Sequence, residues 1–317
     1  MTSHLACRAL LGRVLLLVAL IGCAGCATTR KSGLTGPTKE LVEATRQGNL
    51  EATVQRADTH WQRRHEREEL ARALDLYEKA VEMPTPDLSQ QERIDRLARL
   101  WVRLARGRFM MAQQHVAPGT DEPTDEQKAE QIALFDQGVT AAEHAMVLLD
   151  DDLSKAISGD GKSLAEMVDE AKPAAIPALY WYATNLSKWG VMEGMATIMQ
   201  HQSDIVATMK YICREDPTYM YGGCHRYFGA YWTRVPFGKD AAKSKRHFEA
   251  ALEIAPDFSS NRVVMATYYA RHVDDEALYE RLLREVVQTD PADTPAPIRP
   301  ENIFAHREAE RLLAEDE

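Results

Sequence analysis

Two short stretches of this sequence begin like catalytic or phosphate-binding motifs, and both are incomplete. His65 and Glu66 start a zinc-protease pattern, but a glutamate occupies the position where a second histidine must share the helical face. Residues 159–163 (Gly-Asp-Gly-Lys-Ser) resemble the end of a phosphate-binding loop, but Ala156 stands where the first glycine is required and no predicted strand precedes it. We interpret the first stretch as a solvated helix face and the second as a loop that begins a helix.

The remaining polar candidates do not form a catalytic set. Three adjacent acids, Asp150 to Asp152, could meet a cation, but such a run at a helix end is more often solvated. No Ser/His/Asp arrangement stands out. His225 lies among aromatic residues beside Arg226, where it is either structural or part of a binding groove. The sequence therefore predicts a binding protein with no catalytic residues, no metal and no cofactor.

Cys23 is the residue for which the sequence predicts a covalent modification. The apolar run 14–21 is too short to span a bilayer, so residues 1–22 are predicted to be a secretory signal peptide. The run ends in Leu-Ile-Gly-Cys, which resembles the bacterial lipobox, and several acyl chains on Cys23 would give stable anchoring. Ala24 directly after the cysteine favours, by similarity, the periplasmic side of the outer membrane.

The rest of the chain divides into a tether and one domain. Residues 23–38, which include the cysteine to be lipidated and are rich in Thr, Gly and Ser, are predicted to form a flexible tether. Residues 39–317 are predicted to be the folded helical-repeat domain, and 45% hydrophobic residues suffice for a substantial core. The net charge of −10 argues against nucleic acid as a partner, because no basic face is available for phosphates.

A repeated spacing of apolar residues and proline predicts helical hairpins. Phe248, Ala251 and Pro256 match the second helix of a tetratricopeptide-type hairpin, in which Phe fills the core and Ala admits the next helix. Proline ends the helix because it cannot continue it. The same spacing recurs at Met209, Ile212 and Pro217, at Leu283, Val286 and Pro291, and in part at Tyr77 and Ala80. We therefore predict an all-α fold, a tetratricopeptide-like array of helical hairpins (α-α superhelix).

Hydrophobic periodicity sets the expected helix boundaries. The predicted helices span 39–57 with a break near 48–49, 58–82, a segment that begins at a capping box of Ser89 and Glu92, 125–149, 174–200, 203–215, 218–233, 240–255, 259–271, 274–289 and 300–315. Residues 150–173 are the least regular and are predicted to be a loop with a short helix. No stretch alternates in the manner of a strand, so no strands are predicted.

Cys213 and Cys224 leave two interpretations. Cys213 closes one predicted helix and Cys224 opens the next, and an exported protein can form disulfides. A bond between them would join two neighbouring helical units, whereas the alternative is two separate buried thiols. We favour separate thiols, because the sequence alone cannot place the two Cβ atoms within bonding range.

Several phrases, taken together, resemble the TatT family, the tetratricopeptide lipoproteins associated with tripartite ATP-independent periplasmic (TRAP) transporters. The likeness is dense from about 174 to 314, and it is weakened by Cys224 within one of the phrases and by the 150–173 insertion. The phrases are the lipobox, Leu179-Tyr180-Trp181 with Trp189, Gly222-Gly223-x-His225-Arg226-x-x-Gly229, Pro236-x-Gly238, Arg246-His247-Phe248-Glu249-x-Ala251-Leu252, and Pro300-Glu301-Asn302-x-x-Ala305 with Arg311-Leu312-Leu313.

The resemblance implies a periplasmic scaffold, a homotrimer around a central pore. In that role the protein docks the periplasmic substrate-binding protein of a TRAP transporter and receives a hydrophobic small-molecule ligand. Helical repeats suit the task because stacked hairpins present a long concave surface. The alternative is a tetratricopeptide lipoprotein that serves as a scaffold for assembling outer-membrane or envelope complexes.

Four residues are predicted to line a recess or the partner-docking edge of the array. Trp181 and Asn185 are four residues apart and share a helix face. The glycine pair 222–223 allows a tight turn before the helix that holds His225 and Arg226. Stacking the hairpins in order would bring these two helix starts to the same end. The alternative for the aromatic residues is packing between hairpins.

Overall fold

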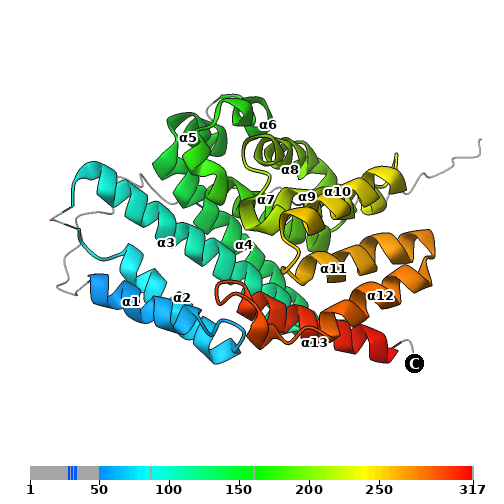
Figure 1. The fold of residues 1–317 in the computed structure, drawn as a ribbon. Helices are drawn as coiled ribbons and strands as arrows, with labels where there is room; N and C mark the ends of the chain where they lie inside the picture. The colour runs from blue at the N-terminus through cyan, green and yellow to red at the C-terminus, as the bar shows by residue number, and fades with distance from the viewer. Residues whose placement is uncertain are drawn as a thin grey trace, which may run out of the picture.

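The described residues fold as an all-α protein. The computed structural model describes residues 28, 30, 32–33, 50–85, 88–120, 122–159 and 161–315, so the predicted signal peptide, Cys23 and the start of the predicted helix 39–57 lie outside them. Within these ranges there is no strand (Figure 1). The helices are α1 (Leu50–Trp61), α2 (Arg67–Val81), α3 (Gln90–Met110), α4 (Asp125–Leu149), α5 (Asp151–Ser158), α6 (Leu164–Met167), α7 (Ile176–Glu193), α8 (Met195–Glu215), α9 (Tyr219–Arg234), α10 (Ala241–Ile254), α11 (Ser260–Met265), α12 (Glu276–Val287) and α13 (Arg299–Glu315).

Neighbouring helices along the chain pack as hairpins, and these hairpins stack. The pairs are α1 with α2, α3 with α4, α7 with α8, α9 with α10 and α12 with α13, while α4 also packs on α7. The repeated apolar positions face the core: Phe248 and Ala251 are fully buried, and Met209, Ile212, Leu283 and Val286 are at most 2% exposed. The predicted all-α hairpin array is confirmed, because the spacing that predicted it marks its most buried side chains.

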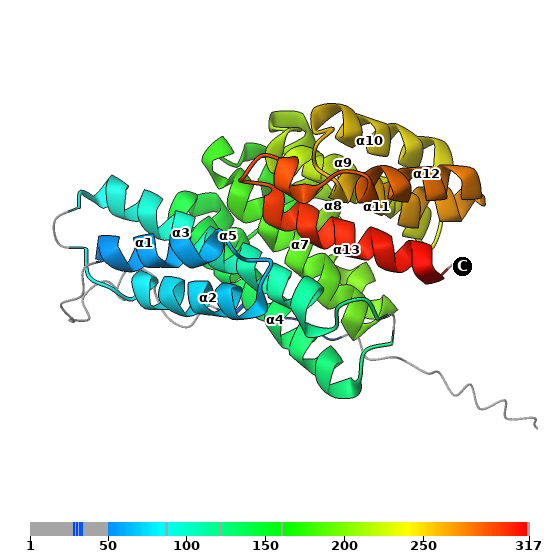
Figure 2. The ribbon, with the colours of Figure 1, turned by 60° about the horizontal axis from the view of Figure 1, so that its bottom comes forward.

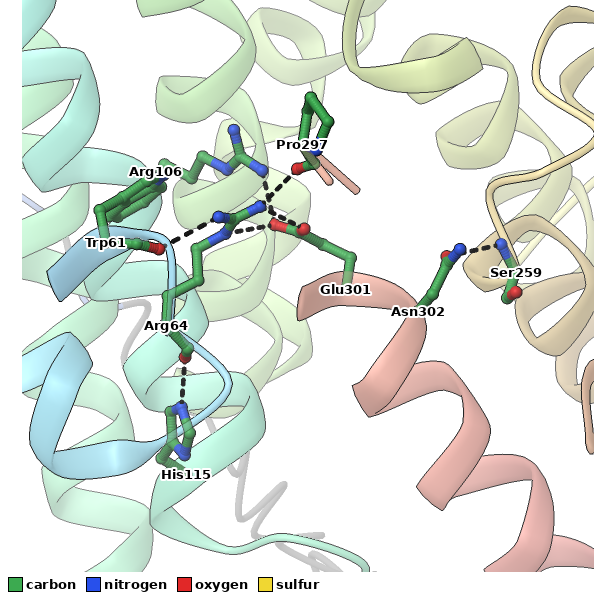
Figure 3. Close-up of polar contacts among 8 residues, drawn as sticks. All are labelled: Trp61, Arg64, Arg106, His115, Ser259, Pro297, Glu301 and Asn302. Atoms are coloured by element: carbon green, nitrogen blue, oxygen red, sulfur yellow. Dashed lines mark hydrogen bonds and ion pairs between the residues drawn. The ribbon is translucent and has the colours of Figure 1, made fainter. Parts of the chain in front are cut away.

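Two hydrophobic cores meet beside α13. The larger core extends from α1 to α9, and the smaller one, which contains Phe248 and Tyr279, lies among α10 to α13. Figure 2 shows α13 between the group formed by α1–α4 and the group formed by α11 and α12. At its start, Glu301 contacts Arg64 of the first group, and Asn302 Oδ1 accepts a hydrogen bond of 3.0 Å from the Ser259 backbone amide of the second (Figure 3).

The predicted helix 58–82 is wrong in its continuity, because the chain turns between α1 and α2. Residues 62–66 leave the helix, and the turn directs Arg64 inward, where its side chain is 4% exposed. Arg64 Nη2 donates to the Pro297 carbonyl at 2.7 Å, and the Arg64 carbonyl lies 3.0 Å from His115 Nε2. The sequence keeps a helical pattern of charged and apolar residues across this turn. The contacts of Arg64 with residues distant in the sequence nevertheless stabilise the turn instead of a continuous helix.

The predicted helix 174–200 is also divided. The break lies at Gly194, whose φ of 126° is a conformation that side-chain-bearing residues rarely adopt. α7 ends at Glu193 and α8 starts at Met195, so the predicted break between 200 and 203 is absent. By contrast, α4 has the predicted bounds, and Ser89 and Glu92 form the predicted capping box. The 150–173 segment contains two short helices, α5 and α6.

Cys213 and Cys224 form a disulfide, so the favoured interpretation of two separate thiols is wrong. Their Cα atoms are 5.5 Å apart. The reason is a left-handed turn over residues 220–222, which returns the start of α9 to the end of α8. This turn could not be located from the sequence spacing of the two cysteines.

Part of the predicted tether lies against α4 and α8. The Thr28 amide donates to Thr197 Oγ1 at 3.1 Å. Arg30 donates to Asp136 Oδ1 at 2.6 Å, to Thr140 Oγ1 at 2.7 Å and to Glu143 Oε1 at 2.5 Å, and its side chain is 6% exposed. We refer to Arg30 with Asp136, Thr140 and Glu143 as the N-terminal clasp.

Candidate functional site

A recess of about 370 Å³ opens where α3 meets the first turns of α7 and α9. One side is apolar and aromatic, and the other carries guanidinium groups. The apolar side consists of Ala98, Val102, Leu149, Ala174, Pro177, Trp181 and Tyr219, and the polar side consists of Asp95, Arg99, Arg103 and Arg106. The recess is of the size that small-molecule sites have, near the lower end of their range.

Helical periodicity of α3 explains the charged side. Asp95, Arg99, Val102 and Arg106 follow one another at intervals of three or four residues, so their side chains project from one face of the helix. Ser89 caps the N-terminus of α3 and Glu92 completes the capping box, which fixes where that face begins. The charged side of the recess is therefore part of a regular helix, not of a loop.

The aromatic side depends on the first turns of α7 and α9. Pro177 lies in the first turn of α7, where proline suits the helix, and Trp181 follows one turn later. The Trp181 ring is 4% exposed and packs against Phe109 and Tyr180, with centroid distances of 5.5 and 5.1 Å. Tyr219 packs edge-on against Tyr180 at 5.4 Å. Burial raises the pKa of the Tyr219 hydroxyl above its ordinary value.

Three guanidinium groups surround one indole beside the recess. The Cζ atoms of Arg64, Arg103 and Arg106 lie 5.2, 4.9 and 5.4 Å from the ring centroid of Trp61, within the range of cation–π contact. Arg106 also lies 5.9 Å from the centroid of Trp181. The aromatic rings thus hold the guanidinium groups in place. Because the rings carry no net charge, these contacts do not neutralise the positive charge.

Glu301 neutralises part of this cluster. Its carboxylate accepts from Nη2 of both Arg64 and Arg106 at 2.5 Å (Figure 3). Burial alone would raise the pKa of Glu301, but Arg106 and Arg64 hold it below its ordinary value. We refer to Glu301 with Arg64 and Arg106 as the C-terminal latch, because it joins α13 to the α1–α2 turn and to α3.

Asn185, which was predicted to share the groove with Trp181, lies one turn deeper in the core. It is fully buried, and its Nδ2 donates to the Trp181 carbonyl at 2.8 Å and to the Ala105 carbonyl at 3.2 Å. Gly138 leaves room for it, because a Cβ there would lie 2.2 Å from Asn185 Oδ1. Asn185 therefore links α7 to α3 behind the recess and does not line it.

Arg226 also lies behind the recess, where it supports the left-handed turn at the start of α9. Met220, Tyr221 and Gly222 have φ values of 50°, 60° and 76°, which costs free energy for residues with side chains. Arg226 donates to the carbonyls of Met220 and Tyr221 at 3.0 and 3.1 Å, and to Asn261 Oδ1 at 2.7 Å. These bonds offset that cost, and the turn they hold places Tyr219.

The glycine pair is required by close approach on both sides of this turn. A Cβ on Gly222 would lie 3.0 Å from the Cα of Ala251, and a Cβ on Gly223 would lie 2.5 Å from the ring of Tyr180. Tyr180 in turn stands next to Trp181. The two glycines of the Gly-Gly-x-His-Arg phrase therefore allow the close packing that supports the aromatic side of the recess.

His225 lies apart from the recess and faces α10. Its Nδ1 is 3.0 Å from Nδ1 of His247, and burial lowers the pKa of both rings, that of His247 to about 4. Both are neutral at pH 7, so one ring donates to the other. Cys213, Cys224 and His225 are the group of described residues whose ligand atoms lie close enough for a metal, but both sulfur atoms belong to the disulfide.

Of the four predicted groove residues, the structure places Trp181 on the recess, Asn185 and Arg226 directly behind it, and His225 elsewhere. The sequence reasoning missed Arg99, Arg103, Arg106 and Tyr219. The spacing of the arginines on one helix face could have indicated this side of the recess, but such a face is usually solvated. The aromatic residues that oppose it lie about 80 to 120 positions later in the chain, so no local pattern connects the two sides.

A second hollow of about 620 Å³ lies along α8 and α9. Four of its polar groups pair with one another: Arg214 lies 2.8 Å from Asp169, and Gln202 Nε2 donates to the Tyr231 hydroxyl at 2.8 Å. It therefore has less unbalanced charge to offer a ligand than the recess beside α3.

The described residues thus form an array of helical hairpins with a ligand-sized, partly aromatic recess. The family model described as TRAP transporter T-component matches residues 96–317, which include α13 and all of the recess except Asp95. The chain belongs to this family and is thus a component of a TRAP transporter system, as the resemblance implied. No curated protein matches the chain. No described helix is both long and apolar enough to cross a membrane.

Proposed function

We propose that this T component is a lipoprotein on the periplasmic side of the outer membrane that docks the substrate-binding protein of its TRAP system and receives an apolar ligand. The observation that carries the proposal is the family match over residues 96–317. The recess supports the ligand part, because Trp181, Tyr219 and Val102 line its apolar side.

The docking surface that we propose lies at the turn between α7 and α8. Val191, Met195 and Met199 are 63, 60 and 50% exposed, and the last two are one helical turn apart on α8. Exposed apolar side chains that gather on one surface commonly mark protein contacts, and methionine adapts to different partners. The occupant that we propose is the substrate-binding protein of the same transporter.

Capture from the envelope tests this docking. The lipidated protein should retain a TRAP substrate-binding protein in a pull-down, and Met195→Glu with Met199→Glu should abolish capture without changing the unfolding midpoint. Glu280→Gln, an exposed change on α12, is the matched control. Capture of envelope-assembly proteins instead would favour the alternative scaffold role.

The same variant tests whether the chain forms the homotrimer implied by its family resemblance. Light scattering should give a trimer mass for the wild type. A trimer that dissociates in the Met195→Glu, Met199→Glu variant would assign this surface to the chain's own copies and overturn the docking proposal.

The lipid anchor is tested at Cys23. Cys23→Ser should stop acylation and leave the precursor uncut. The measurements are incorporation of labelled fatty acid and fractionation of the envelope. A variant that still carries the label and still fractionates with the outer membrane would contradict the proposal.

A further inference from the structure

The recess beside α3 carries more positive charge than the protein neutralises. Arg106 is paired with Glu301 in the C-terminal latch, and Glu301 is shared with Arg64. Arg99 and Arg103 line the same recess, and within the described part of the chain neither has a carboxylate in ion-pair range. Three arginines on the recess therefore face one lining acid, Asp95, and a share of Glu301.

The second observation is how Arg103 is held. Its guanidinium lies 4.9 Å from the centroid of Trp61, so the planar group is supported on a buried ring instead of being free in solvent. An arginine fixed in this way loses less freedom when it binds, and its fork of N–H groups fits a carboxylate with two hydrogen bonds.

The surroundings also favour an added anion. The first turn of α7 contributes Pro177 to the recess, and the N-terminus of a helix carries partial positive charge. Burial lowers the pKa of Arg64, and repulsion from Arg106 and Arg103 adds to this, although Glu301 opposes it. The guanidinium groups therefore repel one another, and a bound anion would relieve that repulsion.

The apolar side of the recess indicates the chemical character of the remainder of the ligand. Trp181, Tyr219, Val102 and Leu149 present apolar surface within the same recess of about 370 Å³. A space at the lower end of the small-molecule range suits one short apolar body better than a two-chain lipid. A ligand that satisfies both walls has an apolar body and a small anionic head group.

We propose that the recess binds a single-chain amphipathic carboxylate, with its carboxylate on Arg103 and Arg99 and its apolar body against Trp181 and Tyr219. This inference rests on the proposed function, because it names the chemical class of the ligand that the T component would receive. Arg106 acts as a positioning residue, held by Glu301, and completes the positive field.

The test compares three probes that share one ten-carbon chain: decanoate, decanol and decyl phosphate. Each is titrated calorimetrically into residues 23–317 carrying Cys23→Ser and produced without the signal peptide, so that no acyl group competes. Decanoate should bind at least tenfold more tightly than decanol, and added salt should reduce that difference. The double variant Arg99→Gln, Arg103→Gln should weaken decanoate at least tenfold and leave decanol unchanged.

Controls separate loss of charge from loss of fold. Arg281→Gln removes an exposed arginine on α12 and should change none of the affinities. Unchanged decanol binding in the double variant shows that the apolar wall is intact. Arg99→Gln alone, at an exposed position, should weaken decanoate several-fold even if the Arg103 change proves destabilising.

Each of the other possible binding results would contradict a specific part of the proposal. Equal affinity for decanoate and decanol would overturn the anionic head group and leave the apolar ligand of the proposed function standing. Tenfold tighter binding of decyl phosphate than of decanoate would overturn the carboxylate. Binding of none of the three probes would overturn the ligand role altogether, while the capture experiment would still report on docking independently.

Discussion

Two buried carboxylates in this protein meet arginine in opposite ways. Glu301 in the C-terminal latch lies between Arg64 and Arg106, and these two cations hold its pKa below its ordinary value despite burial. Glu143 in the N-terminal clasp is 3% exposed at its side chain, forms an ion pair with one described arginine, Arg30, and accepts from Ser32, and burial keeps its pKa above its ordinary value. One arginine does not offset what burial costs this acid, whereas two do.

The difference follows from where the arginines come from. Arg64 stands in the turn between α1 and α2, where it also donates to the Pro297 carbonyl, and Arg106 is part of α3, so both cations lie between packed helices. Arg30 reaches Glu143 from a segment that precedes the first described helix, in which Thr28 donates to Thr197 and Ser32 donates to Glu143. We therefore expect loss of the latch to affect the whole fold and loss of the clasp to act locally.

Breaking the latch should have the largest effect. Glu301→Ala leaves Arg64 and Arg106 buried without their carboxylate, and removing one partner of a buried pair costs about 3–5 kcal/mol. The measurement is the free energy of unfolding in a urea titration. A loss below about 1 kcal/mol would show that solvent reaches these guanidinium groups and that the latch is not a buried pair in effect.

Opening the clasp should have a smaller and local effect. Glu143→Gln keeps the shape but removes the charge that Arg30 meets, and a hydrogen bond to a charged group contributes about 1.5–3 kcal/mol. Cleavage by trypsin after Arg30, followed by mass spectrometry, should accelerate roughly tenfold or more, since opening exposes the bond. Glu126→Gln, an exposed change on the same helix, is the control. Equal cleavage rates would mean that Asp136 and Thr140 hold Arg30 without Glu143.

The two carboxylates should also differ in the sign of their pH dependence. Because the pKa of Glu301 is lowered by folding, its stabilisation is present above its ordinary pKa of 4.5 and is lost as pH falls. Because the pKa of Glu143 is raised, its contribution is most favourable below that value and is lost as pH rises through the raised pKa. Each slope is at most about 1.4 kcal/mol per pH unit.

This pH dependence is measured with the two Gln variants between pH 3.5 and 7. The difference in unfolding free energy between wild type and Glu301→Gln should shrink on acidification. The difference for Glu143→Gln should shift in favour of the wild type over the same range. Slopes of the same sign for the two variants would contradict the comparison.

An exposed pair gives the baseline for both regions. Lys79 and Asp75 on α2 are 2.6 Å apart and each is 60% exposed at its side chain. Lys79→Ala should therefore change the unfolding free energy by only about 0.3–0.5 kcal/mol. A cost near that of the latch would show that burial is not what distinguishes the two kinds of ion pair.

Local signals predicted the helices well, and contacts between distant residues produced the errors. The capping box at Ser89 and the bounds of α4 could be read from neighbouring residues, and the spacing around Phe248 identified core positions. The turn that buries Arg64 depends on Glu301, more than 200 residues away, and no local pattern announces that partner.

The candidate site was predictable only in part for the same reason. Trp181 was recognised from its aromatic phrase, and Arg226 from its place after a glycine pair. The role of Arg226 depends on the left-handed turn at Met220 and Tyr221, residue types that seldom adopt that conformation. The same turn brings Cys224 to Cys213, so missing it also led to the wrong prediction for the cysteines.

The clasp has a consequence for how far the domain can travel from a membrane. If Cys23 is acylated as proposed, Arg30 lies seven positions after the anchor, which is a reach of at most about 25 Å. If the contacts of Arg30 are released, the predicted tether of residues 23–38 would allow a reach of about 50 Å. A docked Arg30 thus confines the search for a partner to a thin shell beside the bilayer, where the effective concentration for membrane-proximal partners is high.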